Sequence, residues 1–270
     1  MAAESSGEAT NGKLMPTTEQ TLYDVRNGGA WITLNRPERR NALSPTLIAE
    51  THDHLLAAND DDEVRCVVIT GSPPAFCAGA DLKAKRGQET GGRVIPYPQL
   101  LTQIQDNPKP VIAAVNGPAF AGGLGIVGAV DISITADDVV FSFSEVRIGV
   151  IPAVISVVCL PKLGAHNAMK LFLTGERFSA QQAVDMGLVH RAVPADQLGD
   201  AVQEEIDMIC LGGPNAVAES KKLVRRVPLM SREEGFAETA PWSARMFASE
   251  EGAEGMAAFR EKRKADWVRS

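Results

Sequence analysis

Two predicted buried strands, each ending in a loop of glycine and alanine, constrain this chain more than any other feature. The first strand is predicted over residues 65–70 and leads through the turn 71–74 into the small-residue segment 76–83. The second is predicted over 111–115 and leads into the segment 116–125. β-Branched runs favour buried strands, and glycine and alanine let the following backbone approach a ligand closely. The sequence therefore predicts two loops that present main-chain N–H groups.

The order of the other predicted elements indicates an α/β fold. A hairpin is predicted over 22–34, and Ser44 followed by Pro45 marks the start of a helix that precedes the strand at 65–70. This strand, helix, strand order favours a sheet that is at least partly parallel. Helices dominate the second half, with a short strand expected at 188–189 and four amphipathic helices at 201–211, 216–227, 232–248 (broken or kinked at Pro241) and 252–266.

The length and net charge of the chain limit the number of domains and the kinds of binding partner. A chain of 270 residues suits one large domain, because cores stop growing near roughly 250 residues. We expect a disordered N-terminal tail (1–18), a sheet-based core (19–200) and a C-terminal helical region (201–270). The net charge of −7 disfavours nucleic-acid binding. The cysteines are scattered, the N-terminus shows no targeting signal, and no apolar run is long enough for a membrane span. These features predict a cytoplasmic protein without membrane partners.

The two small-residue loops predict a site for an anionic oxygen. If Ala78-Gly79-Ala80 and Ala121-Gly122-Gly123 lie side by side, each can donate one main-chain N–H to the same oxygen. The second loop also opens a helix, whose N-terminus favours negative charge. The alternative is that both are tight turns at which strands and helices pack closely.

Glu145 is the side chain that most strongly suggests chemistry. It stands among aliphatic and aromatic residues, and burial there is expected to raise its pKa and suit it to proton transfer. The alternative is an ion pair with Arg147 or a cap on the following turn. Asp81 and Asp131 also lie near the loops, and we interpret them as structural acids.

The segment 123–128 fits the dinucleotide pattern G-x-G-x-x-G, which makes a nicotinamide oxidoreductase a rival hypothesis. A dinucleotide-binding loop turns directly off its strand, whereas here the segment 116–122 intervenes, and the following helix is short. The histidines are not paired with a cysteine or serine in a nucleophile elbow, so neither an acyl-enzyme nor a metal site is expected.

Several motifs together resemble the crotonase superfamily, the enoyl-CoA hydratase/isomerase group. They occur in that family's order at 34–43, 76–82, 114–123, 143–152 and 173–176. The resemblance implies an α/β, ClpP/crotonase-like spiral of ββα units with a C-terminal helical trimerisation region. It also implies a homotrimer or a dimer of trimers, and an acyl-CoA substrate in which coenzyme A is part of the substrate, with no separate cofactor.

The resemblance also implies roles for particular residues. The amides of Ala80 and Gly122 would hold the thioester oxygen as an enolate forms, and Glu145 would be the acid and base. The residues that would contact coenzyme A are Arg40, Ala42, Ala78, Leu82 and Lys83, together with Phe259 and Lys262 at the nucleotide end, often from a neighbouring subunit.

One departure from the family pattern bears on the reaction. Hydratases with two catalytic glutamates place the first of them where this chain has Gly125. A lone Glu145 suits an isomerase that moves a 3-enoyl double bond to the 2-position with one base. The segment 143–156, however, resembles a bacterial branch of single-glutamate hydratases associated with branched-chain enoyl-CoA. We therefore predict a 2-enoyl-CoA hydratase, with the isomerase and a catalytically inactive CoA-binding or scaffold protein as alternatives.

Overall fold

The predicted hairpin begins the sheet. The computed structural model describes residues 19–82 and 93–268, so the predicted tail at 1–18 lies outside the described residues. Strands β1 (Thr21–Arg26) and β2 (Gly29–Leu34) pair antiparallel. Asn27 and Gly28 join them with φ of 48° and 81°. This left-handed turn geometry matches the twist of the strands, which explains why the Asn-Gly pair forms a hairpin.

Parallel strands complete the larger sheet and confirm the α/β fold. Its order is β1-β2-β3-β4-β6-β9, and every pair after the first is parallel. The later strands are β3 (Cys66–Gly71), β4 (Val111–Val115), β6 (Ile132–Ala136) and β9 (Arg191–Val193). Parallel neighbours need crossover connections. The helices α1 (Pro45–Asp60), α2 (Tyr97–Asp106) and α3 (Gly122–Ala129) lie in the connections from β2 to β6.

A smaller sheet brings two later segments together. It has the order β5-β7-β8, with β5 (Ala119–Phe120) parallel to β7 (Val140–Ser142) and β8 (Arg177–Ser179) antiparallel to β7. Phe120 is the register partner of Ser142. The chain segments that leave β5 and β7 therefore start from neighbouring positions.

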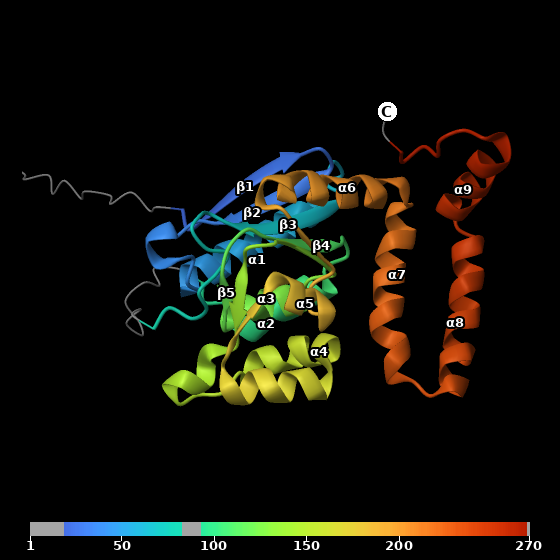
Figure 1. Cartoon of the computed structure of the whole chain (residues 1–270). Helices are drawn as coiled ribbons and strands as arrows, with labels where there is room; N and C mark the ends of the chain where they lie inside the picture. The colour runs from blue at the N-terminus through green and yellow to red at the C-terminus, as the bar shows by residue number, and fades with distance from the viewer. Residues whose placement is uncertain (1–18, 83–92, 269–270) are drawn as a thin grey trace, which may run out of the picture.

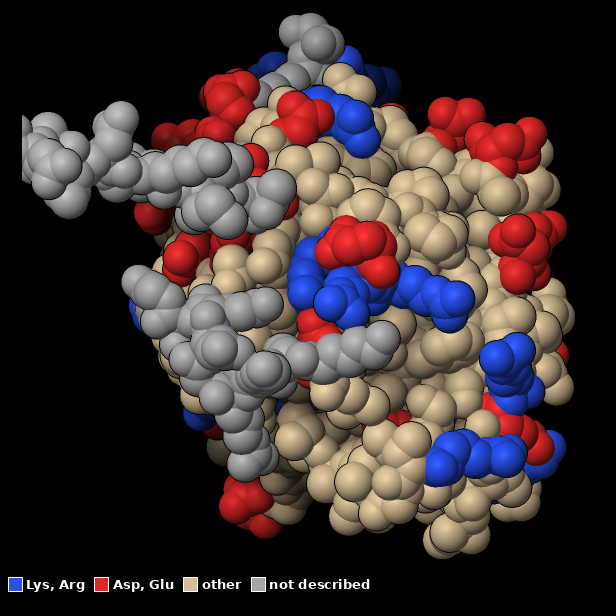
Figure 2. Space-filling model, turned by 90° about the vertical axis from the view of Figure 1, so that its left-hand side faces the viewer, with Lys and Arg blue, Asp and Glu red and all other residues tan. Residues whose placement is uncertain are grey.

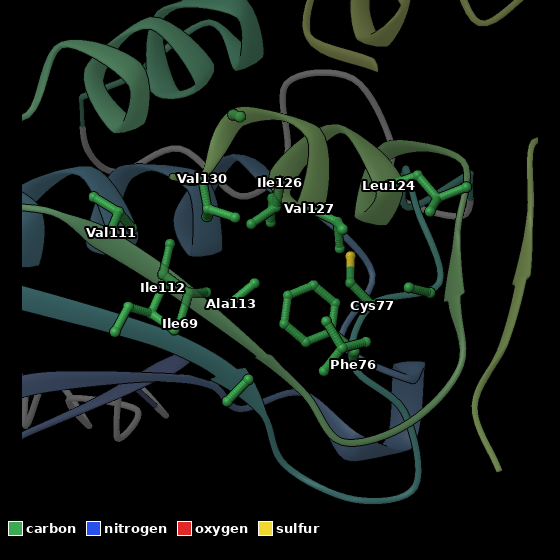
Figure 3. Close-up of a cluster of buried hydrophobic side chains, with 14 of the residues drawn as sticks. Ile69, Phe76, Cys77, Val111, Ile112, Ala113, Leu124, Ile126, Val127 and Val130 are labelled. Atoms are coloured by element: carbon green, nitrogen blue, oxygen red, sulfur yellow. The ribbon is translucent and has the colours of Figure 1, made fainter. Parts of the chain in front are cut away.

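Both small-residue loops rest on the same apolar core. Figure 3 shows Phe76 and Cys77 among Leu124, Ile126 and Val127 of α3. All five side chains have no exposed surface. Side chains of β3 and β4 complete the cluster from the sheet side (Figure 3). Because close-packed interiors resist displacement, this packing fixes the starting points of both loops.

Helices predominate in the second half of the described chain. They are α4 (Ala153–Thr174), α5 (Ala180–Asp185), α6 (Leu198–Leu211), α7 (Pro214–Arg226), α8 (Arg232–Phe247) and α9 (Glu250–Glu261), and four short 3-10 helices lie at Pro37–Arg39, Ser144–Ile148, Ala195–Gln197 and Val227–Leu229. Figure 1 shows α7, α8 and α9 standing beside the core on the right. Lys221 and Arg225 attach α7 to the core through Asp131, at 2.7 and 2.9 Å. In the described ranges, none of the helices has the length and apolar character that a membrane span requires.

Two local predictions are wrong, the strand at 188–189 and a break in the helix at Pro241. Residues 188–189 are not a strand, because the N–H groups of Leu188 and Val189 donate to Ala183 O at the end of α5, and the strand β9 begins only at Arg191. Helix α8 continues through Pro241. A proline removes one N–H donor, and α8 nevertheless runs from Arg232 to Phe247 across that position.

Candidate active site

The two small-residue loops lie against each other. We name residues 76–82 loop 1 and residues 116–122 loop 2. Cys77 forms a parallel bridge with Ala119, and Phe120 N–H donates to Cys77 O at 2.9 Å. The core beneath them and these backbone bonds place the tips of both loops side by side, as the sequence predicts.

Glycine is required at the closest approach. Gly79 has φ of 92°, which side-chain-bearing residues rarely adopt. A Cβ atom at Gly79 would lie 2.9 Å from Ala121 Cβ and 3.2 Å from Gly122 N. The space between the loops therefore admits backbone and excludes side chains.

In each loop, a hydrogen bond to the carbonyl oxygen fixes one peptide unit near the tip. The Gly79 carbonyl accepts from Leu43 N–H at 2.8 Å, and the Ala121 carbonyl accepts from Leu124 N–H at 2.9 Å. The N–H groups on the other side of these peptide units belong to Ala80 and Gly122. Within the described part of the chain, neither of these two N–H groups donates to a backbone carbonyl or a side chain. Two anchored peptides thus leave their donors available to an acceptor from outside the chain.

Ala121 turns the second of these peptides. Its φ of 47° and ψ of −118° lie where non-glycine residues are rare. Such a conformation costs on the order of 1–3 kcal/mol and persists only when its surroundings hold it. Ala121 N–H donates to Ser142 O at 3.0 Å, which ties the strained residue to β7. The strained residue and its bond to β7 together set the direction of the Gly122 N–H.

Glu145 reaches this region because of the strand register. It lies in the 3-10 helix Ser144–Ile148 directly after β7, whose partner β5 leads into Gly122. Its Oε2 atom is buried without a hydrogen-bond partner, and burial raises the pKa of the carboxyl. The alternative ion pair with Arg147 is wrong, since Glu145 forms no ion pair with any described residue. A half-buried carboxyl group with one oxygen free of hydrogen bonds suits proton transfer.

The raised pKa makes a prediction about stability. Because the folded-state pKa of Glu145 lies above its unfolded value, the folded protein keeps the proton to a higher pH, and ionisation at neutral pH lowers the free energy of unfolding. Glu145→Gln stays neutral and is expected to raise the melting temperature at neutral pH. Thermal melts over a pH series will measure this. The gain must shrink as pH falls through the pKa values of Glu145, and a constant or negative difference would contradict it.

A tyrosine fills the place expected for a second carboxylate. A Cβ atom on Gly125 would overlap the Tyr97 hydroxyl oxygen and would lie 2.6 Å from Ile155 Cγ2. The Tyr97 hydroxyl donates a hydrogen bond to Gly122 O. Sequence reasoning missed Tyr97, because it lies at the start of α2, far along the chain from both loops. The only local signal is its position after Pro96 at a helix start.

The residues expected to border coenzyme A gather beside loop 1. Ala78 N–H donates to Arg40 O at 2.9 Å, and Arg36 donates to Ala42 O at 2.7 Å. Leu82 is 75% exposed, and Lys83 lies outside the described residues. Asp81 forms a buried ion pair with Arg36 at 2.9 Å. The structure therefore brings Arg40, Ala42, Ala78 and Leu82 to one place.

The structure does not bring Phe259 and Lys262 to the loops of the same chain. Figure 1 shows α9 at the far right, whereas β5 of loop 2 lies on the left of the core. Phe259 is 86% exposed, and Lys262 follows α9 in a left-handed conformation with φ of 56°. Within one copy of the chain, α9 therefore lies away from both loops.

Known proteins share this sequence and fold. Residues 24–270 match the family model of enoyl-CoA hydratase/isomerase. The chain is 35% identical to a carnitinyl-CoA dehydratase of Proteus mirabilis, over 92% of this chain and 98% of that protein. It is 34% identical to an enoyl-CoA hydratase of Mycobacterium tuberculosis, over 90% and 94% of the two chains. A solved enoyl-CoA hydratase of Mycobacterium smegmatis superposes with a TM-score of 0.84 at 31% identity, over 93% and 99% of the chains.

Proposed function

This chain belongs to the enoyl-CoA hydratase/isomerase family and is an enzyme of the hydro-lyase type, and we propose that it adds water to the 2,3 double bond of a 2-enoyl-CoA thioester. The observation that carries the proposal is the pair of N–H groups on Ala80 and Gly122, which have no acceptor among the described residues and lie at adjoining loop tips. The half-buried Glu145, with its buried Oε2 atom, follows the strand that pairs with loop 2. Addition of water to a conjugated thioester forms an enolate, so donors for one oxygen and one group that moves protons are what the reaction needs.

The two amides would stabilise the developing charge. As water attacks the carbon that is β to the thioester carbonyl, the electron pair of the double bond moves toward the carbonyl oxygen. Donors fixed in advance by Leu43 and Leu124 need no reorganisation when that charge appears. Preorganised donors in a water-excluded site contribute more than they would in water. The glycines that keep this space free of side chains are therefore part of the catalytic arrangement.

Glu145 would serve as base and then as acid. Its carboxylate accepts a proton from the attacking water as the new C–O bond forms. The resulting carboxylic acid then gives that proton to the α carbon of the enolate, which regenerates the carboxylate and restores the thioester carbonyl. The buried and unpartnered Oε2 supports this role, because a raised pKa brings the two protonation states closer in energy.

The coenzyme A part of the substrate would lie along loop 1. Figure 2 shows lysine and arginine side chains gathered near the centre of one face of the molecule, with acidic side chains beside them. Arg39 and Arg40 are exposed beside loop 1 and suit the phosphate groups of coenzyme A. We propose that Phe259 and Lys262 of a second copy complete this site in a homotrimer or a dimer of trimers. Exposed apolar side chains of α8 and α9, Phe236 and Phe247 among them, support such assembly.

One observation favours the isomerase as a second candidate. Position 125 lacks a carboxylate and cannot gain a side chain without displacing Tyr97 and Ile155. A single base suffices to carry a proton between two carbons.

Product mass separates the candidates. The protein is incubated with a short 2-enoyl-CoA in heavy-oxygen water, and in parallel with a 3-enoyl-CoA. Hydration is expected to add one labelled water to the first substrate. Conversion of the 3-enoyl-CoA without a change in mass, and without hydration, would favour the isomerase. Binding of acyl-CoA without turnover of either substrate would favour the inactive CoA-binding protein.

A further inference from the structure

The Tyr97 hydroxyl lies against the end of loop 2 and the first turn of α3. It donates to Gly122 O, on the peptide unit next to the one whose N–H points to the site. The same oxygen fills the space over Gly125. Tyr97 thus brings α2 into contact with loop 2.

We propose that Tyr97 is a positioning residue, which holds Gly122 so that its N–H points at the thioester oxygen and which takes the space that a second acidic side chain would need. The inference rests on the proposed function, because it concerns the same thioester oxygen.

The strain in loop 2 shows why such a residue is needed. Ala121 carries a positive φ, and a residue in that region relaxes unless neighbouring contacts prevent it. Ser142 O holds the peptide before Ala121, and Leu124 N–H holds the peptide after it. Tyr97 adds a side-chain donor at the next carbonyl, that of Gly122, which is the first residue of α3.

The surroundings keep the Tyr97 hydroxyl a donor. Burial raises its pKa well above the ordinary range, and the nearby Glu145 carboxylate acts in the same direction. The hydroxyl therefore stays protonated at neutral pH, with its one proton directed at Gly122 O. Because the neutral Tyr97 hydroxyl fills the space over Gly125, Glu145 has no second acid beside it at position 125.

The test compares Tyr97→Phe with Tyr23→Phe. The chain has two tyrosines, so the same loss of one oxygen can be made at Tyr23, which stacks on His54 in the β1 and α1 region. The probe is dimethylaminocinnamoyl-CoA, a conjugated thioester whose absorbance moves to longer wavelength when its carbonyl is polarised. Turnover of a short 2-enoyl-CoA is measured in parallel.

Tyr97→Phe is expected to reduce the red shift of the bound probe and to lower kcat about tenfold, the scale of one neutral hydrogen bond, with KM within about threefold of wild type. The acid limb of the pH profile should stay in place, because Glu145 is unchanged. Gly125→Ala, whose Cβ would displace the hydroxyl, is expected to reduce the shift in the same direction. Tyr23→Phe should match the wild type.

The other outcomes overturn the inference. A full red shift with wild-type kcat in Tyr97→Phe would show that the hydroxyl positions nothing. A full red shift with turnover lost more than about a hundredfold would mean that the phenol acts on the reacting atoms. A wild-type protein that neither shifts the probe nor turns over an enoyl-CoA would defeat the proposed function itself, and this inference with it.

Discussion

Glu145→Gln is expected to lower kcat for enoyl-CoA hydration at least about a hundredfold, the low end of what a positioned acid or base contributes. The amide can neither accept the proton of water nor return it to the α carbon. Its shape is nearly the same, and Glu145 forms no ion pair with the described residues that the change would break. The affinity for coenzyme A, measured by titration calorimetry, should therefore remain within about twofold of wild type.

Glu204→Gln is the matched control for this prediction. Glu204 is a surface carboxylate of α6 that pairs with Arg191 at 2.9 Å, and exposed pairs contribute little. Its variant should keep wild-type turnover. If Glu145→Gln also retained full activity, the buried carboxylate would be structural, and the proton would have to move through another group.

Gly79→Ala is expected to lower kcat by about 10²–10³, the loss seen when one donor is removed from an oxyanion hole. The new Cβ would meet Ala121 Cβ at 2.9 Å and Phe120 O at 3.0 Å, so one of the loops must move. Either movement separates the N–H groups of Ala80 and Gly122 from a common acceptor. Steady-state kinetics and the absorbance shift of the bound cinnamoyl thioester will measure the effect together.

Gly164→Ala separates strain from contact in this experiment. Gly164 has φ of 68° in α4, and a Cβ there would meet nothing within 4 Å. An alanine at this position therefore has the conformational cost of a positive φ, but its Cβ does not disturb loop 1 or loop 2. We expect Gly164→Ala to lower the melting temperature and to keep the red shift. Equal losses of the red shift in both variants would mean that general destabilisation, and not the loop contact, explains the Gly79 result.

Local patterns in the sequence are enough for much of the fold and for half of the site. The Asn27-Gly28 turn, the β-branched strands and the two small-residue loops follow from backbone preferences that act within a few residues. Glu145 stands out because a carboxylate in an apolar segment is unusual. The wrong strand at 188–189 has the same origin, since apolar residues that cap α5 look locally like a strand.

Tertiary structure alone decides how the elements of the site meet. Nothing in the sequence around Tyr97 indicates that its hydroxyl lies over Gly125, since that contact depends on how α2 packs beside α3. The same holds for the pair Arg36–Asp81 and for the separation of Phe259 from the loops. The sequence by itself determined the strands, the two loops that expose amides, and the buried acid. Packing between distant segments decided which N–H groups have no acceptor within the described chain and that Tyr97 fills the space over Gly125. These features depend on contacts between residues far apart in the sequence, which local backbone preferences do not determine.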